Sequence, residues 1–517
     1  MVKSDRCGRK EGGTDRRRFL TDGCALCAGA GLMAAPGWAR ARPALGKLRL
    51  RVVYVLSAVV QKSNDWPNLG FDFAPVMEKY NNALTGAFAE IEFLPVIAKG
   101  PTRMSAVLAG DLGRDVDGYI VFQLNSWKLS VLPVTATKKP MLFVPLMYAG
   151  TGGFLVFNDM FLRQKAGNVG FVSSSDFDDV IEAVKCFESV KSGGASGFGD
   201  AVARVRRERT PGPGDLTLAP DPLPAITAEE AISRMKESRI LAVGYPGVSS
   251  RWIPMIGMKM IPFSELDRAF RKADPDRARE LAGRWREDAA VVEGVSEQAL
   301  ADSAAMHLGM ESLMKKYGAN AVTVNCLVGF YSGGLHAYPC MGFHEMNNNG
   351  LVGACECDVR SAGTMLAVNA LSGGRPGYIS DPVLDTANRR IIYAHCVASN
   401  RPFGPDGPAN PFEILTHSED RKGASVRSIL PAGYLTTTIE IAPERKEILM
   451  HRAKTVGNDP DDRACRTKLV AEPVGDFEKL FTFWDRWGWH RVTVYGDLKD
   501  RVHELAEAMG YRVVQEA

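Results

Sequence analysis

The chain has 517 residues, of which 45% are hydrophobic and 24% charged. This composition excludes a disordered or collagen-like chain, and the length suggests about three domains of ~150 residues each. The near balance of 63 basic and 60 acidic residues excludes a generally basic nucleic-acid binder. Residues 1–41 carry a net charge of +4, so the basic excess belongs to the N-terminus and the remaining chain has a net charge of −1.

Residues 1–41 have the three parts of an export signal. Residues 16–20 (RRRFL) are a positive start that resembles the twin-arginine pattern, Gly23–Pro36 is a short apolar core, and residues 39–41 (ARA) are a small-x-small cleavage site. A core of roughly 14 residues is shorter than the ~20 that span a bilayer, and we predict no stable membrane span elsewhere. We expect export by the twin-arginine machinery and a periplasmic mature protein. A Sec signal or a basic tail is the alternative.

The cysteine count argues against a disulfide framework. Cys7, Cys24 and Cys27 lie in the signal, which leaves seven of the ten cysteines, and an odd number cannot pair completely. Twin-arginine substrates fold in the reducing cytoplasm, where disulfides are rare. Export after folding also suits a protein that takes up a particular metal ion first.

Strand and helix patterns alternate from residue 48 onward. Leu48–Leu56 is typical of a buried strand, and Val76–Ala87 has helical spacing with Pro75 suited to its first turn. Further strands are expected at Ile91–Pro95, Asp117–Gln123, Pro140–Val144 and Gly153–Val156, with a helix at Met104–Gly110. This alternation indicates a doubly wound parallel sheet, and we assign residues 48–165 to an N-terminal α/β domain.

A second α/β domain is predicted over residues 166–325. Its strands are expected near 168–172 and at Ile240–Gly244, Met258–Pro262 and Ala321–Val328, and its helices at Asp176–Ser192, Glu265–Arg286 (broken at Pro275) and Ser296–Tyr317. Residues 193–225, rich in Gly and Pro, are expected to form a loop or surface insertion. We place Arg204, Arg206, Arg207 and Arg209 on a solvated helix face rather than at an anion site.

Residues 326–517 form the third predicted unit, which is richer in strands. β-rich stretches at Ser425–Ile441 and Lys446–Thr455 precede a helix, a strand and a helix at Phe477–Trp484, Arg491–Val494 and Leu498–Met509. The predicted fold class is therefore α/β: two doubly wound parallel-sheet domains of Rossmann or flavodoxin-like type, followed by a β-rich α+β C-terminal domain.

The densest group of reactive side chains lies within residues 336–396. Here Asp358 is a plausible N-cap of a helix over Val359–Leu371, and Gly373-Gly374 supplies its end. Short strands on either side, at Leu351–Ala354 and Gly377–Ser380, complete a β-α-β pattern.

A β-α-β unit brings the ends of its two strands to one edge of the sheet, which places Glu356 opposite Asp381. Two carboxylates with imidazoles available make a hard-cation site for Mn²⁺ or Mg²⁺. The alternative is structural: Glu356 would be an acid at a helix N-terminus, and Asp381 a turn residue before Pro382.

Several motifs together resemble the L-fucose/L-arabinose isomerase family. They are the stretch Pro339–Gly350, residues 355–358 (CECD), Ser380-Asp381, His395-Cys396, and the C-terminal Trp487–Asp497. The order of two α/β domains and a β-rich domain matches as well.

The resemblance implies a divalent metal, usually Mn²⁺, held by Glu356, Asp381 and His490. It further implies that Glu356 and Asp381 carry protons in an aldose–ketose interconversion of a free sugar through an enediol. A homo-oligomer, a trimer or a hexamer, is also expected.

Several further residues are candidates for the site besides the three implied metal ligands. We expect His395 to support the ligands from behind or to touch substrate, with a core histidine as the alternative. We expect Trp127 and Trp489 to contact the sugar, although ordinary packing of Trp127 is an equal alternative. His336 and His344 are more typical of loop or supporting residues. A thiolate site at Cys340, Cys355 and Cys357 has spacing unlike common zinc patterns, and the roles of these residues and Cys396 stay open.

Three other functions compete with the isomerase: a periplasmic carbohydrate-binding protein without catalysis, a related carbohydrate enzyme, and a family member with only a structural role. A two-lobed receptor does not need a third unit of this size, which favours the enzyme.

Overall fold

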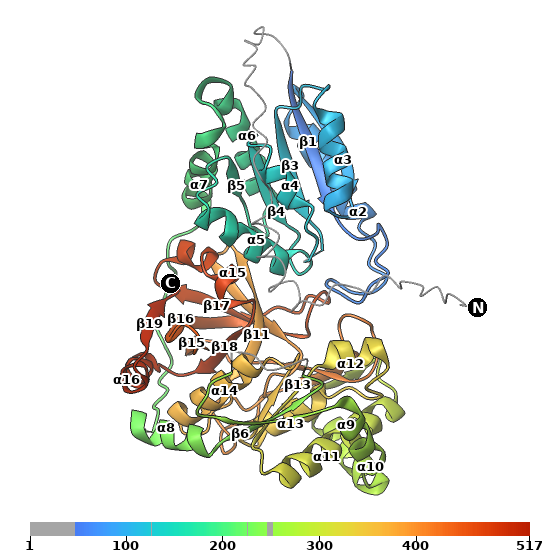
Figure 1. Cartoon of the computed structure of the whole chain (residues 1–517), viewed down its shortest axis with the longest axis vertical. Coiled ribbons are helices and arrows are strands. Elements are labelled where there is room, and N and C mark those ends of the chain that lie inside the picture. The colour runs from blue at the N-terminus through green and yellow to red at the C-terminus, as the bar shows by residue number, and fades with distance from the viewer. Residues whose placement is uncertain (1–46, 126, 225, 246–251) are drawn as a thin grey trace, which may run out of the picture. The chain divides into compact units, whose positions relative to one another are not determined.

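The computed structural model describes residues 47–125, 127–224, 226–245 and 252–517 (Figure 1). The predicted export signal at residues 1–41 therefore lies outside the described residues. Within those ranges, the helices are too short or too polar to cross a membrane.

The first sheet is parallel and five-stranded, with strand order β2-β1-β3-β4-β5. Its strands are β1 (Leu48–Val55), β2 (Ile91–Ala98), β3 (Gly118–Gln123), β4 (Met141–Pro145) and β5 (Val169–Phe171). The accompanying helices are α2 (Ala74–Ala87), α3 (Pro101–Asp111), α4 (Val131–Thr135), α5 (Thr151–Arg163), α6 (Phe177–Gly193) and α7 (Phe198–Arg209). Fully buried side chains such as Val52, Phe122 and Leu142 form its core, so the predicted parallel arrangement is confirmed.

Two local predictions in this region are wrong. The apolar run Gly153–Val156 lies in helix α5, whose first nine residues are all buried. A short apolar run does not by itself distinguish a buried helix from a strand. Residues near 168–172, which we assigned to the second domain, supply β5, and β5 pairs with β4 to extend the first sheet.

The glycine- and proline-rich region contains the helix α7 as well as a loop. Its Arg206 is only 5% exposed, so the predicted solvated face is wrong at this position. The guanidinium lies 3.6 Å above the ring of Phe171 and donates to Oε1 of Glu478 at 3.1 Å. Glu478 is far away in sequence, and local spacing could not reveal it.

The second sheet is also parallel, with strand order β10-β9-β6-β7. The strands are β6 (Arg239–Val243), β7 (Gly257–Ile261), β9 (Ala321–Val324) and β10 (Val352–Ala354). Its helices are α8 (Ala228–Glu237), α9 (Phe263–Arg271), α10 (Pro275–Asp288), α11 (Glu297–Tyr317), α12 (Cys326–Ser332), α13 (Cys340–Asn348) and α14 (Val359–Ser372). Pro275 begins α10, which confirms the predicted break.

The C-terminal region forms a closed antiparallel barrel. The strands follow the ring β15-β18-β11-β12-β17-β16, and β16 pairs back with β15. They are β11 (Tyr378–Asp385), β12 (Arg390–His395), β15 (Leu435–Ala442), β16 (Glu447–Asn458), β17 (Thr467–Val474) and β18 (Arg491–Tyr495). The predicted fold class, parallel α/β layers followed by a β-rich region, is thus confirmed.

Smaller elements complete this region. Strand β19 (Arg512–Gln515) joins β16 in parallel, and a separate small sheet has the order β14-β13-β8. These elements are β8 (Val291–Glu293), β13 (Phe412–Leu415), β14 (Ser425–Ser428), α15 (Trp484–Trp487) and α16 (Lys499–Met509), with 3₁₀ turns η1 (Ala195–Gly197) and η2 (Phe477–Phe481).

The predicted β-α-β unit around α14 is wrong in its geometry. The strand before the helix, β10, belongs to the second parallel sheet, whereas the strand after it, β11, belongs to the barrel. β11 does not stop at Asp381 but runs to Asp385, turns, and pairs antiparallel with β12. Glu356 and Asp381 therefore approach each other across the junction of two sheets, not along one edge.

Candidate metal centre

Glu356 stands in a tight turn between β10 and α14. It has φ +57° and the next residue, Cys357, has φ +52°, a left-handed conformation that is uncommon for residues other than glycine. The turn ends at Asp358, whose carboxylate accepts from the backbone N–H groups of Arg360 and Ser361. The predicted N-cap is therefore confirmed, as is the helix end at Gly373.

Three neighbouring barrel strands bring the other members together. Asp381 lies on β11, opposite Ala394 of β12, so His395 at the end of β12 is one residue further along. On the other side of β11, β18 pairs Arg491 with Ser380, and His490 directly precedes that strand. Strand register thus places an acid and two imidazoles at one end of the barrel.

The four side chains converge closely. Nε2 of His490 lies 3.1 Å from Oδ1 of Asp381 and 3.8 Å from Oε2 of Glu356. One ligand atom from each of Glu356, Asp381, His395 and His490 lies within 4.8 Å of the others. Donors at about 2.0–2.6 Å from a shared cation have this mutual spacing, so the geometry fits one ion.

The donor chemistry fits such an ion as well. Asp381 is fully buried, and the buried Nε2 of His395 has no hydrogen-bond partner in the part of the chain that the structure describes. A buried imidazole nitrogen without a hydrogen-bond partner destabilises the folded protein unless a bound ligand contacts it. Two carboxylates and two imidazoles suit Mn²⁺ or Mg²⁺ better than a soft metal. His395 therefore lies with the three predicted ligands as a fourth candidate donor.

His490 is oriented by a carboxylate behind it. Its Nδ1 lies 2.9 Å from Oδ2 of Asp358, an arrangement in which Nδ1–H donates and Nε2 faces the cluster. Burial lowers the pKa of His490, but Asp381, Asp358 and Glu356 together raise it well above its ordinary value. The sequence indicated Asp358 only as a helix cap, and its contact with His490 was missed.

A buried ion pair holds the backbone around His490. Nη1 of Arg491 donates to the carbonyl oxygens of Gly488 and His490, both at 2.9 Å. Nε and Nη2 of the same guanidinium donate to Oε1 of Glu516 at 3.0 and 2.8 Å. Arg491 and Glu516 are both fully buried. This pair fixes the loop that carries His490, and no local sequence signal indicated it.

The predicted aromatic residues form a cluster beside the centre. Trp489 is 6% exposed, and its Nε1 donates to the carbonyl of Pro382 at 3.3 Å. Trp66 and Trp127 meet the Trp489 ring edge-on, with centroids 5.1 and 5.5 Å away. A Cβ at Gly152 would lie 2.7 Å from the Trp489 ring, so only glycine fits there. Trp66 was missed in the sequence, and sugar contacts by Trp127, Trp489 and His395 stay predictions.

Two other histidines lie outside the cluster. His336 is paired with Asp267, with 2.7 Å between Nδ1 and Oδ1. His344 is buried, with Nδ1 2.7 Å from the carbonyl of Ala398. The expectation that neither is a ligand agrees with these positions.

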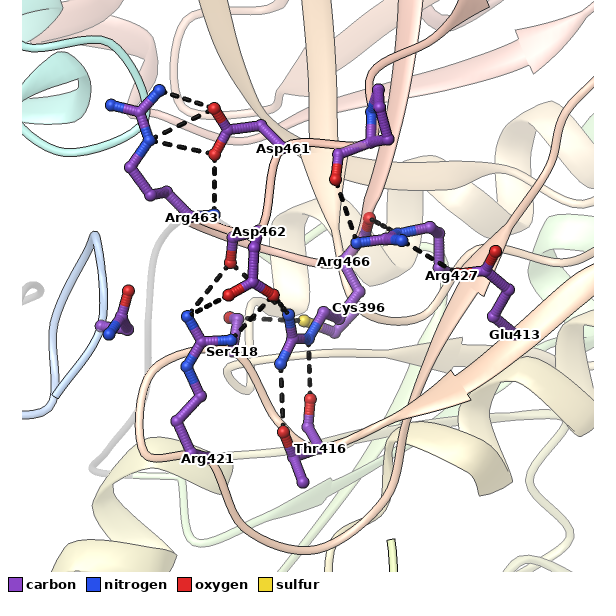
Figure 2. Close-up of polar contacts among 12 residues, drawn as sticks. Cys396, Glu413, Thr416, Ser418, Arg421, Arg427, Asp461, Asp462, Arg463 and Arg466 are labelled. Atoms are coloured by element: carbon purple, nitrogen blue, oxygen red, sulfur yellow. Dashed lines mark hydrogen bonds and ion pairs between the residues drawn. The ribbon is translucent and has the colours of Figure 1, made fainter. Parts of the chain in front are cut away.

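Arginines of two loops, residues 416–424 and 459–466, lie near Cys396, the residue that follows His395 in the chain (Figure 2). Arg466, which is 3% exposed, donates to the carbonyl of Thr416 at 2.8 Å and pairs with Asp462 at 2.5 Å. Arg421 pairs with the same Asp462 at 2.8 Å. The sulfur of Cys396 lies 3.9 Å from Oγ of Ser418 in this region. Protein carboxylates and carbonyls thus satisfy these guanidinium groups, which points to a structural role for the two loops.

No protein-family model matches the chain. Similar proteins include a sulfoquinovose isomerase of Clostridium sp. (strain MSTE9), 26% identical over 214 residues, or 40% of this chain and 46% of the relative. A sulfoquinovose isomerase of Priestia megaterium (strain ATCC 12872 / QMB1551) is 24% identical over 198 residues, 37% and 42% of the two chains. One of Alkalicoccus urumqiensis is 26% identical over 214 residues, 40% and 47%. The chain spans less than half the length of these relatives.

Proposed function

We propose that the chain is a metal-dependent aldose–ketose isomerase of a free sugar. The observation that carries this proposal is the convergence of Glu356, Asp381 and His490, joined by His395, with ligand atoms spaced as donors to one ion are. Similarity to several sulfoquinovose isomerases supports a sugar isomerase at the level of reaction class. The sugar itself, fucose-like, arabinose-like or sulfonated, is left to experiment.

Mn²⁺ or Mg²⁺ would be held by Glu356, Asp381 and His490, with His395 as a fourth donor. When bound, the ion supplies positive charge beside the sugar oxygens on which charge develops during the reaction. Asp358 keeps His490 in the orientation that presents Nε2, and the Arg491–Glu516 pair holds the backbone on which His490 stands.

The proton transfers would fall to the two carboxylates. Converting an aldose to a ketose removes the proton at C2, returns one to C1, and moves a hydroxyl proton from O2 to O1. Asp381 is enclosed, with 1% of its side chain exposed, whereas Glu356 is 16% exposed. This difference in exposure to water suits the two carboxylates to different parts of the proton transfer, one as the base and the other as the acid.

The decisive test combines metal content with turnover. The purified protein should contain about one Mn²⁺ or Mg²⁺ per chain and interconvert at least one sugar in a screen of pentoses, hexoses and sulfonated hexoses. Glu356→Gln should abolish turnover, while Glu265→Gln, which changes a carboxylate paired with Lys316 outside the centre, should leave it unchanged. Full activity in Glu356→Gln would overturn the proposal.

A carbohydrate-binding protein without catalysis is the second candidate, favoured by the tryptophan cluster beside the centre. Calorimetry separates the two functions. Tight sugar binding with no isomerised product, and unchanged after metal removal, would favour the binding protein.

We also infer twin-arginine export to the periplasm and assembly into a homotrimer or homohexamer. The pattern at residues 16–20 supports export, and the family resemblance supports assembly. Cell fractionation with Arg16 and Arg17 both changed to Lys tests the route, and light scattering tests the mass. Unchanged export in that variant, or a monomer in solution, would contradict the respective inference.

A further inference from the structure

Two buried cysteines contact each other, and one of them immediately precedes the candidate ligand Glu356 in the chain. The sulfurs of Cys326 and Cys355 are 3.2 Å apart, and the two residues are 1% and 5% exposed. A disulfide has an S–S bond of about 2.05 Å, so the sulfurs need to approach by only a little more than ~1 Å.

Strand pairing fixes this contact. Cys326 follows β9 and Cys355 follows β10, and these parallel neighbours are in register at Thr323 and Ala354. The carboxyl ends of parallel strands meet at one edge of a sheet, so the two thiols meet there. Oγ1 of Thr323 lies 3.4 Å from the carbonyl oxygen of Cys355, a further contact between the same segments.

The thiol pair is joined to the candidate metal centre through the backbone. Cys355 directly precedes Glu356 in the chain. Glu356 and Cys357 both have the left-handed conformation, so the turn has little freedom to absorb a displacement. Movement of the Cys355 sulfur toward Cys326 therefore displaces the backbone that carries the Glu356 carboxylate.

We propose that Cys326 and Cys355 form a dithiol site that oxidises to a disulfide and that this bond weakens metal binding at the Glu356 turn. The disulfide itself is independent of the function proposed above, whereas its effect on metal binding rests on that function. The site is a cysteine pair rather than a soft-metal centre, because the one group of three or more closely spaced donors among the described residues contains neither cysteine.

The oxidation needs a small disulfide as the electron acceptor. One cysteine sulfur attacks the S–S bond of the oxidant, forms a mixed disulfide and releases one thiol. The second cysteine sulfur then attacks the mixed disulfide, forms the Cys326–Cys355 bond and releases the second thiol. Two S–H bonds are lost from the protein, and their two electrons and two protons appear in the two thiols released.

Peptide mapping tests the bond. The purified full-length protein is treated with hydroxyethyl disulfide or with dithiothreitol, unfolded in N-ethylmaleimide, digested and analysed by mass spectrometry. We expect a cross-linked peptide pair holding Cys326 and Cys355 only after oxidation. Cys326→Ser should remove it, and Cys186→Ser, at a cysteine packed in the core of the first sheet, should retain it. Maleimide on both residues after oxidation, or cross-links confined to Cys340, Cys396 or Cys465, would overturn the site.

Calorimetric titration with Mn²⁺ tests the coupling. We expect about tenfold weaker binding to the oxidised protein, restored by dithiothreitol and absent in Cys326→Ser, in line with the usual effect of disturbing the support of a ligand. Equal affinity of both forms would overturn the coupling. If the reduced protein binds no Mn²⁺, the proposed function and the coupling fail together, and a mapped cross-link still establishes the dithiol site. Cys355→Ala serves as a second variant if Cys326→Ser does not fold.

Discussion

His490 and Asp358 are joined by a 2.9 Å contact between Nδ1 and Oδ2, while the other carboxylate oxygen of Asp358 caps helix α14. One side chain therefore fixes both a helix start and the direction of an imidazole. This double role couples the turn that carries Glu356 to the loop that carries His490.

Asp358→Asn separates the two roles. Asparagine caps helices as well as aspartate does, so stability should change little. The imidazole loses its charged partner, and we expect Mn²⁺ affinity to fall about 10-fold, measured by calorimetry. Asp358→Ala removes the cap as well and should cost about 1 kcal/mol more in unfolding free energy. Unchanged Mn²⁺ affinity in Asp358→Asn would show that the contact does not orient His490.

The Arg491–Glu516 pair gives a prediction on acid stability. Burial raises the pKa of Glu516, but the charges of Arg491 and His451 outweigh it and lower the pKa to about 2. Because this pKa is lower in the folded than in the unfolded protein, the Glu516 carboxylate stabilises the fold at pH values above its unfolded-state pKa of about 4.3. The contribution is lost as the pH falls toward 2.

Glu516→Gln should remove this pH dependence of stability and leave Arg491 buried without its counter-charge. We expect a loss of about 3–5 kcal/mol at pH 7, measured by urea unfolding. The exposed change Glu504→Gln should stay within about 0.5 kcal/mol. A wild-type acid profile in Glu516→Gln would contradict the role given to the pair.

Gly152 is predicted to be irreplaceable because of Trp489. An added Cβ would lie 2.7 Å from the indole ring, and that ring is packed between other tryptophans and cannot retreat freely. Gly152→Ala should cost about 1–3 kcal/mol and reduce turnover by displacing the segment before His490. Gly110→Ala on α3, where a Cβ would meet nothing within 4 Å, should be neutral or stabilising. Full stability and turnover in Gly152→Ala would refute the packing argument.

The contact between Asp159 and Asp485 predicts a pH dependence of stability opposite to the one predicted for Glu516. Asp159 of α5 is buried and accepts the backbone N–H of Asp485 at 2.9 Å. Burial, with the Asp485 carboxylate nearby, raises the pKa of Asp159 to about 8. The folded protein thus retains a proton that the unfolded chain loses near pH 4, so stability falls as the pH rises from about 4 to 8, by at most about 1.4 kcal/mol per unit.

Asp159→Asn should flatten this slope, because an amide has no proton to lose. Urea unfolding of both proteins at a series of pH values measures it. Parallel slopes for the variant and the wild type would exclude Asp159 as the group responsible.

The parallel sheets and the cap of α14 could be predicted from the sequence because their signals are local. β1 ends in the apolar run Val52–Val55, preceded by Leu48 and Leu50 in alternation with arginines. Asp358 and Gly373 bound a helix with the expected cap chemistry. Gly153–Val156 shows the limit of such signals, since an apolar run inside a helix buried on most sides has no helical period to detect.

The candidate ligands were anticipated for a partly incorrect geometric reason. Glu356 and Asp381 do converge, but across the junction of a parallel sheet and a barrel rather than at one sheet edge. The place of His395 depends on the register of β11 with β12, and the contact of Arg491 with Glu516 depends on the position of β19. Register between distant strands is set by packing of the whole barrel, which a single sequence does not display.

Anomalous diffraction from a crystal grown with Mn²⁺ tests the central claim most directly. We predict one strong manganese peak with ligand distances of about 2.0–2.6 Å to Glu356, Asp381 and His490, and with His395 in the same shell. A peak at another place, or no peak at these four side chains, would contradict the metal centre and the isomerase built on it.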